Sequence, residues 1–94
     1  MNGEASLKRK LTEEGFHHIY GWHDEPHVEY PAHAHKDKVS MYILAGSLTL
    51  RFGNEEIILK KGDRFDVPPG KEHTALVGPT GCDFLVGEMI EGDS

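Results

Sequence analysis

The chain has 94 residues, of which 37% are hydrophobic and 28% are charged. This length predicts a single domain, and the composition is typical of a folded protein rather than a disordered one. The 16 acidic residues outnumber the 10 basic ones, which gives a formal net charge of −6. Because general nucleic-acid binders need Lys and Arg to neutralise phosphates, we expect no nucleic-acid partner.

The single cysteine and the absence of apolar targeting segments narrow the class of protein further. The single cysteine, Cys82, excludes an intrachain disulfide and a cysteine-rich zinc module. No segment approaches the ~20 apolar residues of a membrane span, and the first residues lack the pattern of a signal peptide. We therefore expect a cytoplasmic protein without a membrane partner. Cys82 is expected to be a small core residue, because the adjacent segment 84–86 is apolar.

The first predicted element is a short helix over residues 6–14. Ser6 can cap its start, Leu7 and Leu11 share one face, and Gly15 stands where helices often end. Residues 1–21 are therefore expected to form this helix and a lead-in strand.

The rest of the chain is predicted to form short strands separated by turns rich in Gly and Pro. The predicted strands cover residues 39–44, 47–52, 55–59, 65–67, 74–77 and 84–86. Gly53-Asn54 is a hairpin signal, and Gly78-Pro79-Thr80-Gly81 is expected to be a connecting turn. Short, evenly spaced strands predict an all-β antiparallel sandwich or barrel. We expect the barrel to span residues 22–90 and residues 91–94 to form a frayed tail.

Three histidines form the candidate site. His33 and His35 are one residue apart, so in a strand both imidazoles would lie on one face. His73 follows the Pro68-Pro69-Gly70 turn and could reach the same place from another strand. Three imidazoles can hold a metal ion and leave positions open for a substrate.

These motifs resemble those of the cupin superfamily. The first cupin motif is G-x5-H-x-H-x3-4-E-x6-G, and this sequence matches it at His33, His35 and Gly46. The second motif is G-x5-P-x-G-x2-H-x3-N, and the sequence matches it at Gly62, Pro68, Gly70 and His73. The resemblance covers roughly residues 22–88. It implies a small double-stranded β-helix (jelly-roll) barrel, a homodimer and a metal site.

The sequence departs from the cupin motifs at three positions. Val39 stands where the first motif has its glutamate, His27 replaces that motif's first glycine, and Val77 replaces the last asparagine of the second motif. The metal ligands implied by the resemblance are therefore His33, His35 and His73 without a carboxylate. Some cupin-fold oxygenases also use three histidines. His27 is an alternative fourth ligand.

Three neutral imidazoles suit a divalent transition metal (Fe, Zn, Ni, Mn or Cu) better than Mg²⁺ or Ca²⁺. Without a carboxylate ligand the site is more positive. It should then bind the metal less tightly, attract an anionic or enolate oxygen more strongly, and make a bound water more acidic.

Three functions remain open at this point. The first is a metal-dependent enzyme, oxygenase-like or isomerase-like, acting on a small oxygen-bearing molecule. The second is a non-catalytic barrel that binds or senses a small ligand. The third is a structural remnant whose histidines bind nothing. The fold alone does not choose among them, because one fold hosts many activities.

Overall fold

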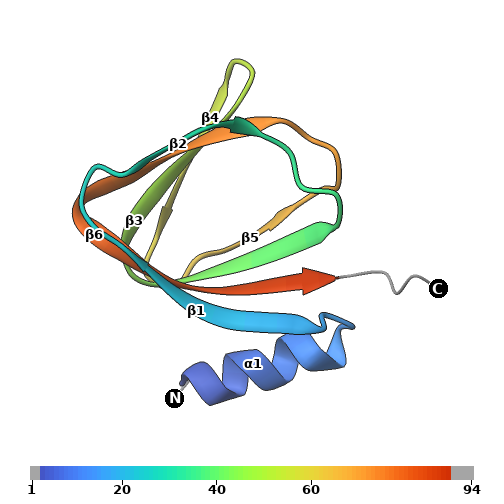
Figure 1. Ribbon diagram of the computed structural model, residues 1–94. Coiled ribbons are helices and arrows are strands. Elements are labelled where there is room, and N and C mark those ends of the chain that lie inside the picture. Colours follow the sequence, from blue (N-terminus) through green and yellow to red (C-terminus); the bar gives the residue numbers. More distant parts are fainter. Residues whose placement is uncertain (1–2, 90–94) are drawn as a thin grey trace.

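The computed structural model describes residues 3–89 as a ring of strands with one helix outside it (Figure 1). The helix α1 (Glu4–Glu13) precedes six strands, which are β1 (His18–Asp24), β2 (Glu29–His33), β3 (Lys38–Phe52), β4 (Glu55–Lys60), β5 (Arg64–Val67) and β6 (His73–Met89). The expected all-β barrel with a short N-terminal helix is confirmed. Within residues 3–89, no helix is both long enough and apolar enough to cross a membrane. The expected tail, 91–94, lies outside the described residues.

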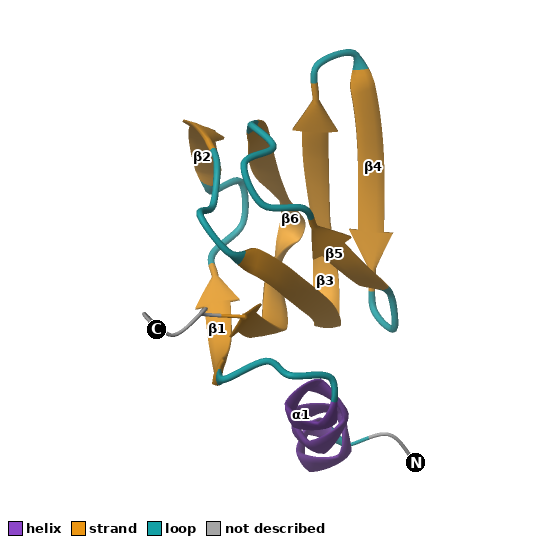
Figure 2. Ribbon diagram, turned by 90° about the vertical axis from the view of Figure 1, so that its right-hand side faces the viewer, coloured by secondary structure: helices purple, strands orange, loops and turns teal. Residues whose placement is uncertain are grey.

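The six antiparallel strands form two layers that share β3 and β6 (Figure 2). In one layer β1 and the first half of β3 flank the second half of β6, and β5 adds to β3. In the other layer β2 and the second half of β3 flank the first half of β6, and β4 adds to β3. The hydrophobic core lies where the inner faces of the layers meet.

The two shared strands are longer than the sequence predicted. The separate strands 39–44 and 47–52 are one strand, β3, and the predicted turn at 78–81 lies inside β6. Gly46 and Gly81 have φ angles of 79° and 84°, which other residues rarely adopt. A Cβ on Gly46 would lie 1.9 Å from the Gly81 carbonyl oxygen. The glycines therefore allow a bend and a close backbone contact inside continuous strands, not a chain reversal.

Helix α1 covers the outer face of the layer that contains β1. It begins at Glu4, because the Gly3 carbonyl accepts hydrogen bonds from the Ser6 and Leu7 amides, so the prediction that Ser6 caps the helix is wrong. Gly15, with φ 102°, follows the helix end as expected. Leu11 is fully buried against Leu85 of β6 and its neighbours, which attaches the helix to the barrel.

An arginine also connects the helix to the strands. Arg64 of β5 donates two hydrogen bonds to the Glu14 carboxylate, at 2.6 and 2.9 Å, and one to the Tyr42 hydroxyl. Hydrogen bonding to Arg64 lowers the pKa of Glu14. This paired contact fixes the end of α1 beside the barrel.

Candidate metal centre

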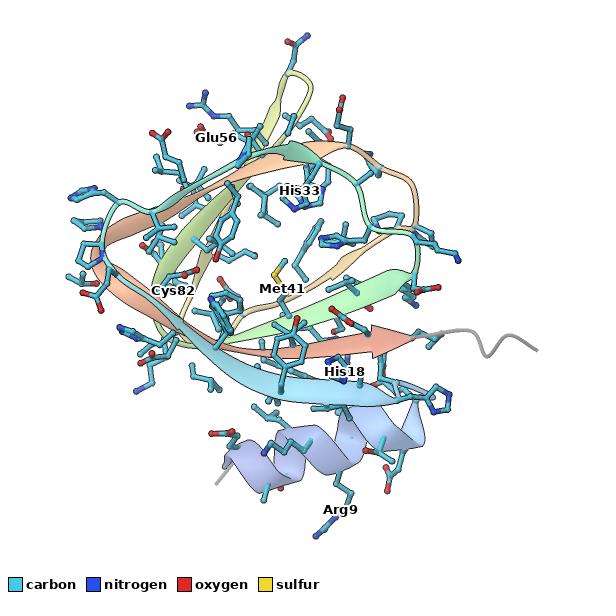
Figure 3. All side chains as sticks on the ribbon, viewed as in Figure 1. Arg9, His18, His33, Met41, Glu56 and Cys82 are labelled. Atoms are coloured by element: carbon cyan, nitrogen blue, oxygen red, sulfur yellow. The ribbon has the colours of Figure 1, made fainter. Side chains whose placement is uncertain are left out.

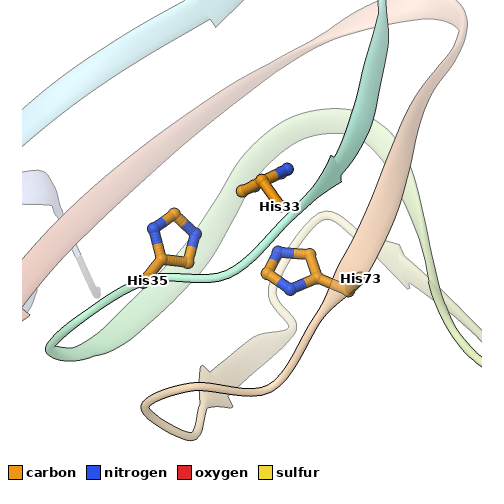
Figure 4. A group of neighbouring side chains, drawn as sticks. All are labelled: His33, His35 and His73. Carbon is orange, nitrogen blue, oxygen red and sulfur yellow. The ribbon is translucent and has the colours of Figure 1, made fainter.

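The three histidines predicted from the motifs come together at one end of the barrel. His33 is the last residue of β2, and His73, the first residue of β6, lies directly opposite it in the strand register. The sequence placed His33 and His35 in one strand, but His35 lies in the loop that follows β2. All three rings nevertheless face a common point, with one ligand atom from each lying within 4.8 Å of the others (Figure 4).

Backbone carbonyls orient two of the three imidazoles. The Nδ1 atom of His33 lies 2.7 Å from the Pro31 carbonyl oxygen, and Nδ1 of His73 lies 3.0 Å from the Lys71 carbonyl oxygen. Because a carbonyl oxygen only accepts hydrogen bonds, each Nδ1 must carry the proton. In the neutral ring the Nε2 lone pair is then free to bind a metal.

The histidine rings are closely packed and partly shielded from water. The His33 and His73 ring centroids are 4.4 Å apart, and the Phe52 ring lies 5.2 Å from that of His73, which is only 4% exposed. Burial lowers the pKa of His35, and the neighbouring His33 and His73 lower it further. Such surroundings favour the neutral imidazole, which is the form that binds metals.

The turn before β6 also holds His35 in place. The amide of Gly70 donates a 2.8 Å hydrogen bond to the His35 carbonyl oxygen. Gly70 has a φ of 75°, as expected for a glycine that ends the Pro68-Pro69-Gly70 turn. The turn therefore helps to position two ligands, since Gly70 lies three residues before His73 and is hydrogen-bonded to His35.

The histidines open into a cavity of about 280 Å³ inside the barrel. In Figure 3, His33 and Met41 both lie within the ring of strands. The wall is mainly apolar, with six aliphatic residues: Val39, Met41, Leu48, Leu50, Ala75 and Val86. Four larger side chains, Tyr20, Trp22, Tyr30 and Phe84, add aromatic surface, and Glu88 is the one carboxylate among the described lining residues.

The polar atoms of the aromatic side chains are engaged by carboxylates. The Tyr20 hydroxyl donates to Glu88 at 3.0 Å, while the Tyr30 hydroxyl and the Trp22 Nε1–H donate to buried Asp24 at 2.6 and 3.0 Å. Burial, followed by the hydrogen bonds to these carboxylates, raises the pKa of both tyrosines to about 12. Both phenols therefore stay protonated and continue to donate at neutral pH.

A carboxylate on the neighbouring strand stands beside the position of the missing motif glutamate, although it is not part of the three-histidine group. Val39 lines the cavity, and Glu88 lies opposite it in the register of β3 and β6. Glu88 carries no motif signal, but it follows Phe84 and Val86 at alternate positions, and that alternation could have placed it on the inner face of a strand. The cavity residues on β1, Tyr20 and Trp22, also stand at alternate positions, so the same reasoning could have placed them on one face of a strand.

The alternative fourth ligand lies outside the three-histidine group. His27 is exposed and adopts a positive φ of 66°, and it is not part of the cluster.

The three imidazoles suit a transition metal in number, chemistry and spacing. Zinc–nitrogen bonds of about 2.0–2.1 Å require ligand nitrogens roughly 3.0–3.5 Å apart in common geometries. From a separation of at most 4.8 Å, each ring would need to move inward by less than about 1 Å. Side-chain rotation can supply a movement of this size.

Comparisons with known proteins identify the fold's relatives. No curated protein matches the chain. Similar solved structures include an RmlC-like cupin from Shewanella frigidimarina (25% identity, TM-score 0.66, covering 80% of this chain and 68% of that one). A protein with a double-stranded β-helix domain from Klebsiella pneumoniae is also similar (27% identity, TM-score 0.64, covering 74% and 64%). The polyketide cyclase RemF from Streptomyces resistomycificus is a third (24% identity, TM-score 0.66, covering 86% and 61%).

These structures are longer than this chain, which spans 61–68% of their lengths. The family model described as a cupin domain matches residues 22–86, which is most of the chain. That region contains β2 to β5 and nearly all of β6, together with the three clustered histidines. The chain belongs to the cupin family.

Proposed function

We propose that this cupin binds one divalent transition metal through His33, His35 and His73 and acts as a metal-dependent enzyme on a small oxygen-bearing molecule. The observation that carries the proposal is the convergence of three imidazoles at the wall of a cavity, two of them oriented by backbone carbonyls. Fe, Zn, Ni, Mn and Cu are the candidate ions, and imidazole suits Fe, Zn, Ni and Cu best, because Mn shares with Mg²⁺ and Ca²⁺ a preference for oxygen ligands.

A bound ion would supply Lewis acidity toward an oxygen atom of the substrate. The protein's own groups would do the rest. The apolar wall excludes water from the bound molecule, and Glu88 can accept a hydrogen bond or a proton from it. Tyr20 donates to the Glu88 carboxylate at 3.0 Å and so limits its orientation. No other carboxylate among the described residues lines this cavity.

The comparisons support an enzyme only in a general way. The polyketide cyclase shares the fold at 24% identity, so it shows that this barrel can host catalysis, not what this chain converts. A non-catalytic barrel that binds a small ligand is the alternative. The two differ in turnover: an enzyme consumes its ligand, whereas a binding module releases it unchanged.

Metal content tests the proposal directly. Protein loaded separately with Fe²⁺, Zn²⁺, Ni²⁺, Mn²⁺ and Cu²⁺ and then desalted should retain about one equivalent of at least one ion by plasma mass spectrometry. His35→Ala and His73→Ala should each lower the metal affinity at least tenfold, because two imidazoles hold a divalent ion far more weakly than three.

The matched control is His17→Ala, which removes an exposed imidazole outside the cluster. It should keep the full metal content, and circular dichroism should show that all three variants are folded. Equal metal retention by wild type, His35→Ala and His73→Ala would contradict the site, and failure of every ion to bind would contradict the metal-dependent function.

A further inference from the structure

The cavity beside the histidines also restricts the kind of molecule that fits there. We propose that it takes a compact aromatic molecule that carries its oxygen atoms at one end only, an inference that rests on the metal-binding function proposed above. Molecules with hydroxyl groups around their whole body, such as sugars and polyols, are excluded. The cavity can form hydrogen bonds with a ligand in some parts of its wall and not in others.

The aromatic part of the wall offers few free polar groups to a ligand. The donors of Trp22 and Tyr30 both point to Asp24, and the Tyr20 hydroxyl donates to Glu88. A ligand hydroxyl in this part of the cavity would lose its water partners with little to replace them. Burying an unpaired hydroxyl costs about 1–3 kcal/mol, so a polyol would pay this cost several times.

The groups that remain free to form hydrogen bonds or metal bonds with a ligand are the three histidines and Glu88. Within residues 3–89, the hydrogen bond from Tyr20 uses Oε2 of Glu88, and Oε1 has no side-chain donor. Glu88 and His35 also line a second, smaller hollow together, so they are neighbours. An oxygen donor and an adjacent hydroxyl at one end of a ligand would satisfy both the metal site and Glu88.

The size and composition of the wall favour an aromatic body. A cavity of about 150 Å³ holds one benzene ring, so a volume of about 280 Å³ accommodates a substituted ring or two fused rings. Tyr30 and Phe84, together with the half-exposed Trp22, give the cavity aromatic surface against which a ring can pack, while Met41 and Leu50 provide aliphatic contacts. Flat ring systems fill such a space without needing hydrogen bonds.

Three hydroxamates that share one metal-binding end test the proposal. Acetohydroxamate, benzohydroxamate and gluconohydroxamate differ only in a small, an aromatic or a polyhydroxylated body. Trp22, the single tryptophan of the chain, lines the cavity, so its fluorescence reports binding to the Zn²⁺-loaded protein. Benzohydroxamate should bind at least tenfold more tightly than acetohydroxamate, and gluconohydroxamate should bind no more tightly than acetohydroxamate.

A pair of variants at Met41 locates the selective contact. Met41→Gln places an amide in the wall at similar volume and should reduce the preference for benzohydroxamate at least fivefold, whereas Met41→Leu should preserve it. Both variants should keep one Zn²⁺ and a folded circular dichroism spectrum. Equal affinities for the three hydroxamates in Zn²⁺-loaded wild type would overturn the aromatic preference while leaving the metal site intact.

A metal-independent measurement separates the two proposals. Ligand-observed NMR on metal-free protein should show binding of p-cresol and none of myo-inositol. If no ion binds but p-cresol does, the proposed metal function fails and the aromatic selectivity stands. If myo-inositol binds as well as p-cresol, the aromatic selectivity is wrong whatever the metal content.

Discussion

At the scale of single residues, two of the three histidines are oriented by the same kind of backbone contact. His33 and His73 each direct Nδ1 to the carbonyl oxygen two residues earlier, at Pro31 and Lys71. Both rings therefore present Nε2 toward the common point without help from other side chains. A carboxylate often orients a metal-binding histidine, but a backbone carbonyl serves equally and adds no charge.

The residue scale also gives a prediction for the single thiol. Cys82 is 2% exposed, as expected for a core residue, and burial, with the nearby Asp24 and Asp83 charges, raises its pKa to about 11. At pH 9 an ordinary thiol with a pKa of 9.0 is half ionised, whereas this thiol should be only about 1% ionised. Reaction with Ellman's reagent at pH 9 should therefore be at least 50-fold slower in the native protein than in guanidinium.

The unfolded protein is the internal control, because its thiol is exposed and unshifted. The native rate should rise with pH beyond 10, as the thiolate, the reactive form, becomes populated. A native rate at pH 9 equal to that in guanidinium would contradict both the burial and the raised pKa.

At the scale of elements, the bend shared by β3 and β6 predicts an unequal effect of two glycine substitutions. Gly46→Ala would force a positive φ on alanine and place its Cβ against the Gly81 carbonyl, so it should lower the free energy of unfolding by about 4 kcal/mol or more. Gly53→Ala imposes a similar φ in the β3–β4 turn, but its Cβ would meet no atom within 4 Å, so it should cost only about 1–2 kcal/mol.

Urea denaturation of the two variants measures this difference. Because both positions have a positive φ, the excess cost at Gly46 reports the backbone contact inside the bend. Equal destabilisation by the two substitutions would mean that the crossing of the strands at Gly46 and Gly81 is less close than described.

The sequence located these glycines but not their role. A glycine with a positive φ can end a strand in a turn or bend a strand that continues, and local sequence does not distinguish the two. At Gly46 the strand continues, because Gly46 pairs with Cys82 of β6. The pairing of β3 with β6 shifts register before and after this position and then resumes. The start of the helix was also predicted wrongly. The sequence suggested a cap by the Ser6 side chain, but the N-cap residue is Gly3, which has no side chain.

The candidate site was more predictable than the cavity around it. His33, His35 and His73 follow from motif spacing, which depends on chain neighbours and one turn. Trp22 and Glu88 line the cavity because β1 and β3 pair with β6, a contact between distant parts of the chain. Sequence patterns therefore predict possible ligands, whereas the selectivity of the cavity appears only in the folded barrel.

At the scale of the whole molecule, the homodimer expected from the sequence stays a prediction. Leu76 and Ile58, 42% and 56% exposed, flank Thr49 in one row across three adjacent strands. A second copy that covers this row would bury both side chains. Sedimentation should therefore show a mass of twice 10.5 kDa for wild type, and Leu76→Asp should shift the protein to a monomer.

Arg9→Asp is the control for this experiment, since Arg9 points away from the barrel on the exposed side of α1 (Figure 3). It also changes the charge on the surface but should leave the mass unchanged. A wild-type monomer at 100 μM would show that the homodimer prediction is wrong.

The shared strands have a consequence for how the chain reaches this structure. Every pair between β3 and β6 joins residues far apart in sequence, from Arg51 opposite Thr74 to Lys38 opposite Met89. Loop-closure entropy must be overcome before such pairs gain stability, and proteins dominated by them fold in milliseconds to seconds. Neither layer is complete until β3 and β6 have met, so the cavity and its histidines should assemble late, in the same slow step that closes the barrel.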